Sequence, residues 1–204
     1  CTASGTAGYS FTGWRGACPG ATCTLTAVSA ARNVTANFSL NSYTISGSAS
    51  PSAGGSVSCT GSVSHGSNGS CTATANTGYT FSGWADCPSA NGINCSFNNV
   101  TANQSAPANF PLNTYSVTGA AAPLAAGSVS CPSPVNHGAS TSCTAIPAEG
   151  FVLSSWTGCT TSSGASCTLS NVTANSSVTA AFVLQTYAIS GTATPTAGGN
   201  VNCT

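Results

Sequence analysis

The sequence GYTFSGWADC, residues 78–87, carries the pattern that decides the fold, because the chain contains it in three versions. Residues 8–18 read GYSFTGWRGAC, and residues 150–159 read GFVLSSWTGC. In each version large apolar side chains, the largest available for a core, precede a cysteine. Repetition at a fixed spacing is typical of proteins that are built from tandem structural units.

The chain repeats with a period of 72 residues along its whole length. Trp14 and Trp84 are 70 residues apart, so the first unit carries a two-residue deletion. The residues that recur with the full period include Phe38, Phe110 and Phe182; Tyr43, Tyr115 and Tyr187; and Cys59, Cys131 and Cys203. We therefore predict a partial repeat at residues 1–42, full repeats at 43–114 and 115–186, and a partial repeat at 187–204.

Composition and local pattern predict an all-β fold for each unit. Lys, Glu, Gln and Met, which favour long helices, are nearly missing, whereas Thr, Val, Tyr and Phe recur between Gly, Pro and Asn. Residues 42–49 alternate Tyr43 with Ile45, as in a strand with one buried face. Residues 54–59 and 69–75 flank a Gly-rich segment, which is typical of a hairpin. We expect a tandem array of disulfide-stapled β-modules of about 72 residues.

The chain contains 12 cysteines, and their spacing predicts disulfides rather than a zinc site. A zinc site needs four converging ligands, but there is no Cys-x-x-Cys pair and the two histidines are distant. The nearest cysteines recur with the period, on the two arms of the hairpin and in the loop after each tryptophan. The predicted pairs are Cys59–Cys71, Cys131–Cys143, Cys87–Cys95, Cys159–Cys167 and Cys18–Cys23. Disulfides indicate an oxidising compartment.

This pairing leaves Cys1 and Cys203, whose equivalents Cys71 and Cys59 lie on the two arms of one hairpin. The partial repeats are therefore complementary, because residues 1–42 supply most of what the segment at 187–204 lacks. We expect Cys203 of one chain to bond Cys1 of the next, in a head-to-tail filament. Two alternatives are a ring closed within one chain and a sequence that is a window of a longer continuous repeat.

The near absence of charge excludes several classes of function. The chain has two Lys+Arg, two Asp+Glu and two His, so it offers no basic surface for nucleic acid or an anionic membrane. Asp86 and Glu149 lie in different units at non-equivalent positions, which provides neither facing carboxylates nor a catalytic triad. We expect no enzyme activity, no catalytic residues, no bound metal and no cofactor.

Histidines and tryptophans are the remaining candidates for a binding site. His65 and His137 could be metal ligands or pH sensors between units, but a His-Gly pair is also ordinary turn chemistry, which we favour. Trp14, Trp84 and Trp156 could stack on sugars, but their fixed place in the repeat favours a core role. The predicted core anchors are Trp14, Trp84, Trp156, Phe38, Phe110 and Phe182. Tyr43, Phe81 and their equivalents should also be largely buried.

Copies of the same chain are the partners that we expect, and glycans are the second candidate. No run of 18 apolar residues is present and no leader is recognisable, so we expect no membrane span. Asn-x-Ser/Thr sequons would carry sugar if the producing organism N-glycosylates secreted proteins. They include Asn33, Asn99, Asn103, Asn171 and Asn175.

The three versions of the tryptophan motif, together with the closing VTANF at residues 34–38, resemble the divergent InlB B-repeat family. These are β-modules of similar size that stand in tandem in large bacterial surface and secreted proteins. The resemblance covers the whole chain, and it implies an extracellular or cell-surface location and a role as spacer, adhesin or stalk, without catalytic residues. We expect an extracellular structural protein that forms a fibre, filament or stalk. The alternative is an adhesive or glycan-binding repeat region, and the exposure of the tryptophans should separate the two.

Overall fold

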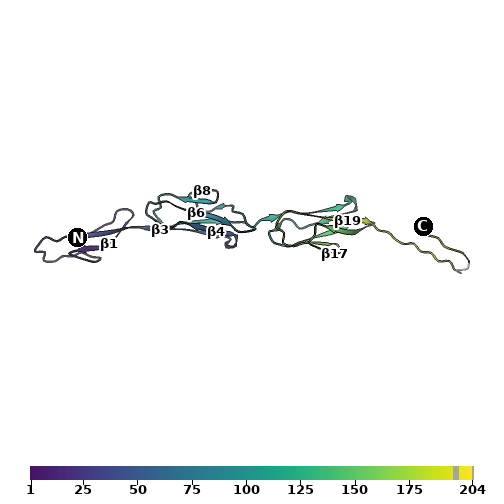
Figure 1. The fold of residues 1–204 in the computed structure, drawn as a ribbon, viewed down its shortest axis with the longest axis horizontal. Coiled ribbons are helices and arrows are strands. Elements are labelled where there is room, and N and C mark those ends of the chain that lie inside the picture. The colour runs from purple at the N-terminus through teal and green to yellow at the C-terminus, as the bar shows by residue number, and fades with distance from the viewer. Residues whose placement is uncertain (195–197, 204) are drawn as a thin grey trace. The chain divides into compact units, whose positions relative to one another are not determined.

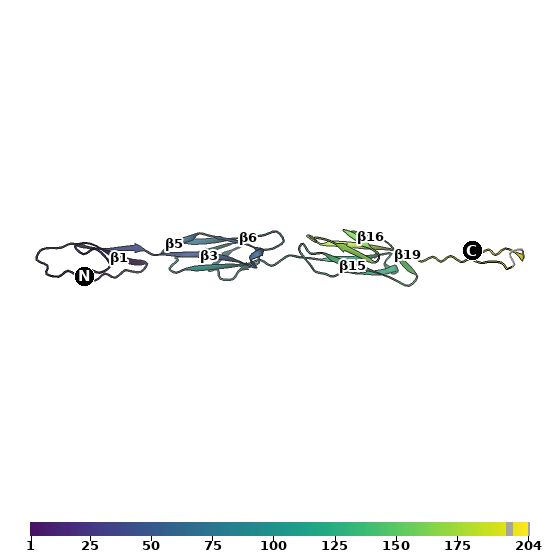
Figure 2. The ribbon, with the colours of Figure 1, turned by 90° about the horizontal axis from the view of Figure 1, so that it is seen from below.

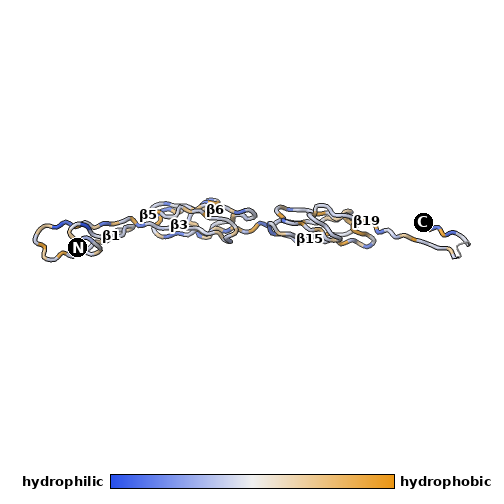
Figure 3. Tube along the Cα trace, turned by 60° about the horizontal axis from the view of Figure 1, so that its bottom comes forward, coloured by the Kyte–Doolittle hydropathy of each residue, from blue (hydrophilic) through white to orange (hydrophobic). Residues whose placement is uncertain are grey.

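The computed structural model describes residues 1–194 and 198–203, and in these residues it contains β strands and two short 3-10 helices (Figure 1). This confirms the all-β fold. The chain divides into two compact units, Cys1–Leu112 and Asn113–Thr204, which are described separately. Among the described residues, no helix has the length and apolarity that a membrane span requires. Figure 3 shows short hydrophobic stretches that alternate with hydrophilic ones along the strands of both units.

The first unit contains ten strands and the 3-10 helix η1. Their bounds are β1 Tyr9–Gly16, β2 Val34–Leu40, β3 Ser42–Ser50, η1 Ser52–Gly54, β4 Gly55–Cys59, β5 Gly61–Ser64, β6 Gly69–Ala75, β7 Gly83–Trp84, β8 Ser89–Asn91, β9 Asn94–Phe97 and β10 Gln104–Asn109. Strands β1 and β2 form a two-stranded antiparallel sheet by themselves. The other strands form two four-stranded sheets, in the orders β5-β3-β10-β7 and β4-β6-β9-β8.

The two four-stranded sheets enclose the core of the first full repeat (Figure 2). Strand β3 runs parallel to β10, with Ile45 opposite Gln104, and the pairs in the other sheet are antiparallel. One core cluster contains Ile45 with Cys71 and Cys95, and a second contains Phe110. Alternation along β3 explains this packing, because Ile45 points into the core while Thr44 remains exposed.

The second unit repeats this architecture. Its elements are β11 Thr114–Tyr115, β12 Val117–Ala122, η2 Leu124–Ala126, β13 Gly127–Ser130, β14 Val135–Asn136, β15 Thr141–Pro147, β16 Phe151–Thr157, β17 Thr161–Ser163, β18 Ser166–Leu169 and β19 Ser176–Leu184. The main sheets have the orders β12-β19-β16 and β13-β15-β18-β17, and β11 pairs with β14. Strand β12 again lies parallel to β19, with Val117 opposite Ser176. Val117 and Phe182 belong to its two core clusters.

The N-terminal partial repeat has one small core around Trp14, Cys18 and Cys23. Its β1–β2 pair corresponds to the β16–β19 pair of the second unit, and both have a bulge in the strand that carries the tryptophan. Within residues 1–42 the structure contains the strands β1 and β2 alone, and they pair with each other. These residues include the strand that closes a core in the full repeats, and no strand of the described residues covers its phenylalanine end.

Candidate functional site

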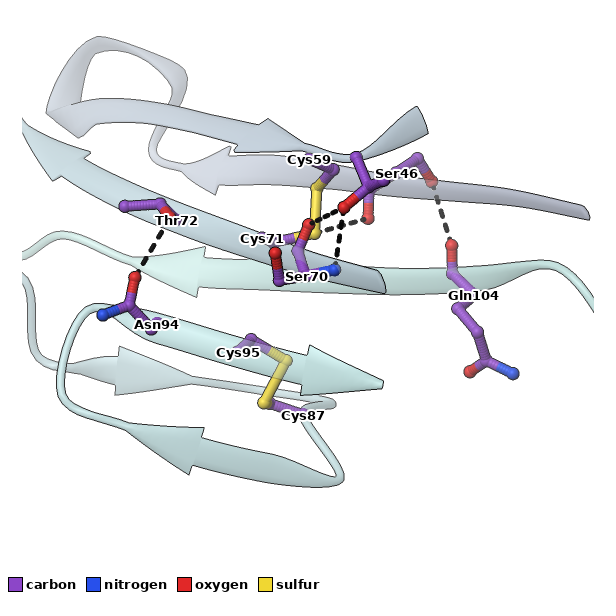
Figure 4. Close-up of a disulfide and its surroundings, with 10 residues drawn as sticks. Ser46, Cys59, Ser70, Cys71, Thr72, Cys87, Asn94, Cys95 and Gln104 are labelled. Atoms are coloured by element: carbon purple, nitrogen blue, oxygen red, sulfur yellow. Dashed lines mark hydrogen bonds between the residues drawn. A yellow bond between two sulfur atoms is a disulfide. The ribbon is translucent and has the colours of Figure 1, made fainter. Parts of the chain in front are cut away.

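The structure pairs ten cysteines in five disulfides, and the pairs coincide with those expected from the spacing. They are Cys18–Cys23, Cys59–Cys71, Cys87–Cys95, Cys131–Cys143 and Cys159–Cys167. Figure 4 shows how two of them reinforce one sheet: Cys59 of β4 bonds Cys71 of β6, and Cys95 of β9 bonds Cys87. Cys71 and Cys95 lie directly opposite each other between these bonds. The two disulfides therefore staple adjacent parts of the same sheet.

Cys1 and Cys203 are the free cysteines of the described residues, and both are exposed. The amino group of Cys1 donates a hydrogen bond to the carbonyl oxygen of Cys23 at 3.2 Å. Cys23 is the equivalent of Cys95, which faces Cys71 across the sheet of the full repeat. Cys1 thus lies beside Cys23 as Cys71 lies beside Cys95.

Cys203 also makes a contact with a glycine that recurs at the equivalent positions of the full repeats. In the first full repeat Gly47 lies against Val57 and Cys59, so closely that an added Cβ atom would be 3.0 Å from the sulfur of Cys59. At Gly191 an added Cβ atom would be 3.2 Å from the sulfur of Cys203 and would overlap Val201. The third set with this arrangement is Gly119, Val129 and Cys131. Gly191 therefore makes the same contact with Val201 and Cys203 that the equivalent glycines make in the full repeats.

Phe38 does not have the core position that the sequence predicts. Phe110 is 0% exposed and Phe182 is 4% exposed, but Phe38 is 40% exposed. In the full repeats the ring packs under the glycine that begins β4 or β13, where a Cβ atom at Gly55 or Gly127 would be 2.8 Å from the ring. The N-terminal repeat has no such segment, so the prediction that Phe38 is a core anchor is wrong.

An open cavity lies on this uncovered surface. It has a volume of about 250 Å³, and it is lined by Ser4, Thr6, Tyr9 and Phe38. Tyr9 is also exposed. The lining is small, uncharged and partly aromatic, so it suits an apolar segment of an uncharged chain.

The tryptophans differ in burial. Trp14 is buried, but Trp84 and Trp156 are only half-buried, which corrects the prediction that all three lie in the core. The indole Nε1 of Trp84 donates to the carbonyl oxygen of Gly92, and that of Trp156 donates to Gly164, both at 3.3 Å. These bonds hold each indole under the rim of a loop, where one side remains open. Tyr43 and Phe81 are likewise half-buried.

Similar open cavities lie beside two of the tryptophans. The cavity at Trp14 has a volume of about 450 Å³ and is also lined by Thr12, Gly13, Arg15, Gly20, Ala21 and Asn37. The cavity at Trp156 has a volume of about 430 Å³ and is also lined by Leu153, Ser154, Ser155, Ser162, Gly164 and Ala165. Each combines an indole with polar side chains or backbone, which is the combination that a sugar ring would need.

Each histidine forms a hydrogen-bonded pair with a tyrosine at a hairpin turn. His65 Nδ1 shares a hydrogen bond with the hydroxyl of Tyr43 at 3.4 Å, and His137 Nδ1 does so with Tyr115 at 3.2 Å. Each histidine precedes a glycine with a positive φ angle, as expected for a turn. In the part of the chain that the structure describes, no group of three His, Cys, Asp or Glu side chains could hold a metal ion.

Asn41 lies at a junction between the N-terminal partial repeat and the first full repeat, which the sequence did not predict. Its amide donates to the carbonyl oxygen of Gly8 at 2.7 Å, and its carbonyl oxygen accepts a bond from the amide of His65 at 2.8 Å. Gly8 lies directly against the His65 ring, so a Cβ atom there would overlap it. The recurrence of an amide side chain at Asn41, Asn113 and Gln185 is the signal that could have revealed this junction.

Comparison with known protein families gives three matches along the chain. A family model described as the divergent InlB B-repeat domain matches residues 1–42, 44–114 and 115–186. No curated protein and no solved structure matches the chain.

Proposed function

Because the chain belongs to the divergent InlB B-repeat family, as the motifs of its sequence indicate, we propose that it is an extracellular or cell-surface structural protein. In this proposal it forms a fibre, filament or stalk by head-to-tail assembly of its β-modules. The tandem repeats and the five disulfides support this role, because disulfides persist in oxidising surroundings. The near absence of charge also means that little electrostatic repulsion opposes contact between copies.

The observation that carries the proposal is the pair of unsatisfied surfaces in the two partial repeats. Phe38 is 40% exposed where its equivalent Phe110 is buried, and Ile189 is 75% exposed where its equivalent Ile45 is 1% exposed. Residues 1–42 do not themselves contain the covering segment, and residues 187–203 have the sequence of that segment. Burying both surfaces together would remove apolar area from water, which favours association.

We further propose that the chain has no catalytic role. Asp86 and Glu149 are both exposed and belong to different units of the structure, so neither is held in a site that would tune a carboxyl group for acid–base chemistry.

Assembly of the purified 204-residue chain tests the proposal. We expect the mass measured by light scattering to rise with protein concentration, and electron microscopy to show linear polymers whose length rises with it. A mass that stays at the 19.7 kDa of one chain over the whole soluble concentration range would contradict head-to-tail assembly. Rings of fixed size would contradict the filament but not the contact between copies.

The cavities at Trp14 and Trp156 favour a second candidate function, an adhesive region that binds glycans. The half-buried indole of Trp156 can stack on a sugar, and a weak site gains avidity when units repeat. Titration with oligosaccharides should then change tryptophan fluorescence, and Trp156→Ala should remove the part of the change that comes from the second unit. A Trp84→Ala variant is the matched control for loss of an indole in the first unit.

A further inference from the structure

The cavity at Trp156 is the site that the contacts of the second unit define most completely. Resting on the second candidate function, glycan binding, we propose that this cavity binds a neutral oligosaccharide of flat pyranose rings, a β-1,4-linked chain of glucose or N-acetylglucosamine. The indole of Trp156 stacks on one sugar ring, and the hydroxyls of Ser154, Ser155 and Ser162 bond to the hydroxyls of the sugar. The first full repeat has a tryptophan at the same position but does not bind this ligand.

The cavity lies between an edge strand of one sheet and a hairpin of the other. Residues 153–156 line it from β16, which in the described part of the chain is at the edge of the sheet β12-β19-β16. Ser162, Gly164 and Ala165 line it from the hairpin that β17 and β18 form. Its volume of about 430 Å³ lies in the range of small-molecule sites, about 300–1,000 Å³.

A β-bulge places two serines beside the indole. In a regular strand consecutive side chains point to opposite faces of the sheet. The register of β16 against β19 shifts between Leu153 and Ser155, and an extra residue at such a bulge changes the direction of the side chains. Ser154 and Ser155 therefore both line the cavity, and both are exposed.

The indole and the hairpin opposite it are held in place by the protein itself. The Nε1 of Trp156 donates to the carbonyl oxygen of Gly164 at 3.3 Å, so the polar atom of the ring already has a partner and the ring can contribute stacking. The disulfide Cys159–Cys167 closes the hairpin, in which Ser162 lies opposite Cys167. Groups that are fixed before the ligand arrives lower the entropic cost of binding.

The hydroxyls around the indole are available to a ligand. In the described residues, the hydroxyls of Ser154, Ser155 and Ser162 make no hydrogen bond to another group of the protein. All three serines are exposed on the lining of one cavity. Hydroxyls both donate and accept hydrogen bonds, as the hydroxyls of a sugar do. The cavity thus combines an apolar ring with polar groups of the kind that orient a sugar.

The first full repeat differs at the same positions. Ser82, at the position of Ser154, already donates to the carbonyl oxygen of Asn109 at 3.2 Å. The other positions replace a hydroxyl or a small side chain: Gly83 stands for Ser155, Ala90 for Ser162 and Ile93 for Ala165. These substitutions remove the free hydroxyls beside Trp84 and add bulk at the position of Ala165. The two tryptophans therefore have the same place in the fold but different neighbours.

The charges of the second unit favour a neutral ligand. Residues 113–204 contain no Lys or Arg, and Glu149 is their one acidic residue. An acidic sugar would find no cation there to offset the desolvation of its carboxylate. Pyranose rings with equatorial hydroxyls present C–H groups to an indole face and hydroxyls at their edges. Residues 153–156 span about 10 Å of extended strand, which suits two such rings.

The test follows the indole N–H signals of the isotope-labelled 204-residue chain by nuclear magnetic resonance. The chain has three tryptophans, in three different repeats, so each signal reports on one repeat. Cellohexaose and chitohexaose are the neutral probes, and a hexamer of galacturonic acid is the acidic probe. Isothermal titration calorimetry gives the dissociation constants.

Two pairs of variants locate the ligand. Ala165→Ile fills the cavity with the residue of the first full repeat, and Ala165→Ser is its control because it changes the same position with little added bulk. Ser162→Ala removes a hydroxyl that lines the cavity, and Ser163→Ala removes one from the next residue of β17, which does not line it. All three positions are exposed, so the variants leave the core intact.

We expect at least one of the two neutral hexamers to shift the Trp156 signal and to leave the Trp84 signal in place. Ala165→Ile should raise the dissociation constant at least about tenfold, because the added side chain occupies the space of a sugar ring. Ser162→Ala should raise it about fivefold, the effect of one lost hydrogen bond. Both control variants should stay within about twofold of the wild type.

Failure of this site can be told apart from failure of the glycan-binding function. If neither neutral hexamer at about 10 mM shifts the Trp156 signal but one shifts Trp14 or Trp84, glycans bind elsewhere and the site is wrong. If no tryptophan signal shifts, the second candidate function fails as well. Equal affinity of Ala165→Ile and the wild type, or of Ser162→Ala and its control, would also overturn the proposal. Equal binding of the acidic hexamer would contradict the neutral class of ligand.

Discussion

The first full repeat and the N-terminal partial repeat contain the same closing strand, but only one of them buries its closing phenylalanine. Phe110 on the full repeat is covered by η1 and the start of β4, where Gly54 lies against its Cβ atom and Gly55 lies against its ring. Phe38 has no such cover and is 40% exposed. The motif therefore defines where a core can form, and the segment that opens the repeat decides whether it does.

The tryptophans of the same two repeats show the opposite contrast in burial. Trp14 in the partial repeat is buried, whereas Trp84 in the full repeat is half-buried. The loop that follows Trp14 is short, and its Gly20 carbonyl oxygen accepts a 2.7 Å hydrogen bond from the Trp14 amide. The partial repeat thus has a small core at its tryptophan end and an open surface at its phenylalanine end.

The largest expected effect tests the phenylalanine contrast. Phe110→Ala should lower the free energy of unfolding of its unit by about 3–5 kcal/mol, because it removes a fully buried ring. Phe38→Ala should cost about 1 kcal/mol, since its ring is already partly hydrated. Chemical denaturation followed by circular dichroism measures both. Phe182→Ala is the matched control and should behave like Phe110→Ala, whereas equal losses at Phe38 and Phe110 would contradict the contrast.

The second prediction concerns the disulfides of the same two repeats. Replacing both Cys59 and Cys71 by alanine should cost about 3 kcal/mol, and replacing Cys18 and Cys23 should cost about 1 kcal/mol less, because the shorter loop restricts the unfolded chain less. The pairs are separated by 12 and 5 residues, respectively. Denaturation of the double variants gives the difference. Non-reducing peptide mapping checks the pairing itself, and a Cys59–Cys95 link would refute it.

Some features of the molecule follow from the sequence because they repeat. The period locates the units, alternation around Ile45 identifies a half-buried strand, and the nearest cysteines coincide with the pairs in the structure. The parallel pairing of β3 with β10 could not be predicted, because a strand pattern identifies a buried face but not the strand that lies beside it. Phe38 could not be placed for the same reason, since its burial depends on a segment far away in the repeat.

The candidate site was predicted in part. The sequence indicated that Cys1 and Cys203 are equivalent to the two arms of a hairpin, but not that Cys1 is held beside Cys23 or that Gly191 packs on Cys203. Those contacts depend on side-chain and backbone geometry that spacing alone does not contain. The half-burial of Trp84 was missed because a recurring indole at a fixed position has the same pattern in a core and at the rim of a loop.

A third prediction addresses the tryptophan contrast. Trp14→Ala should cost about 3 kcal/mol, because Trp14 is buried in the small core with Cys18 and Cys23. Trp84→Ala should cost about 2 kcal/mol, because part of its ring is already exposed. Thermal or chemical denaturation of the two variants gives both values. A larger loss for Trp84 than for Trp14 would mean that the short loop does not stabilise the partial repeat.

The smallest expected effect comes from two glycines that differ in their neighbours. Gly8 and Gly150 have φ angles of 82° and 79°, so alanine should cost each about 1 kcal/mol from backbone conformation alone. A Cβ atom at Gly8 would also overlap the ring of His65, whereas nothing lies within 4 Å of a Cβ atom at Gly150. Gly8→Ala should therefore lose about 1 kcal/mol more than Gly150→Ala.

Hydrogen exchange of the Asn41 and His65 backbone amides reports on the junction in both variants. The Asn41 amide donates to the carbonyl oxygen of Gly8, and the His65 amide donates to the carbonyl oxygen of Asn41. Their protection should fall in Gly8→Ala and stay unchanged in Gly150→Ala, which is the matched control for backbone strain. If both variants lose the same stability and leave this protection intact, the partial repeat is not held to the full repeat by Gly8. The junction would then depend on the backbone hydrogen bonds of Asn41, and the partial repeat would be tethered to the full repeat without side-chain packing at Gly8.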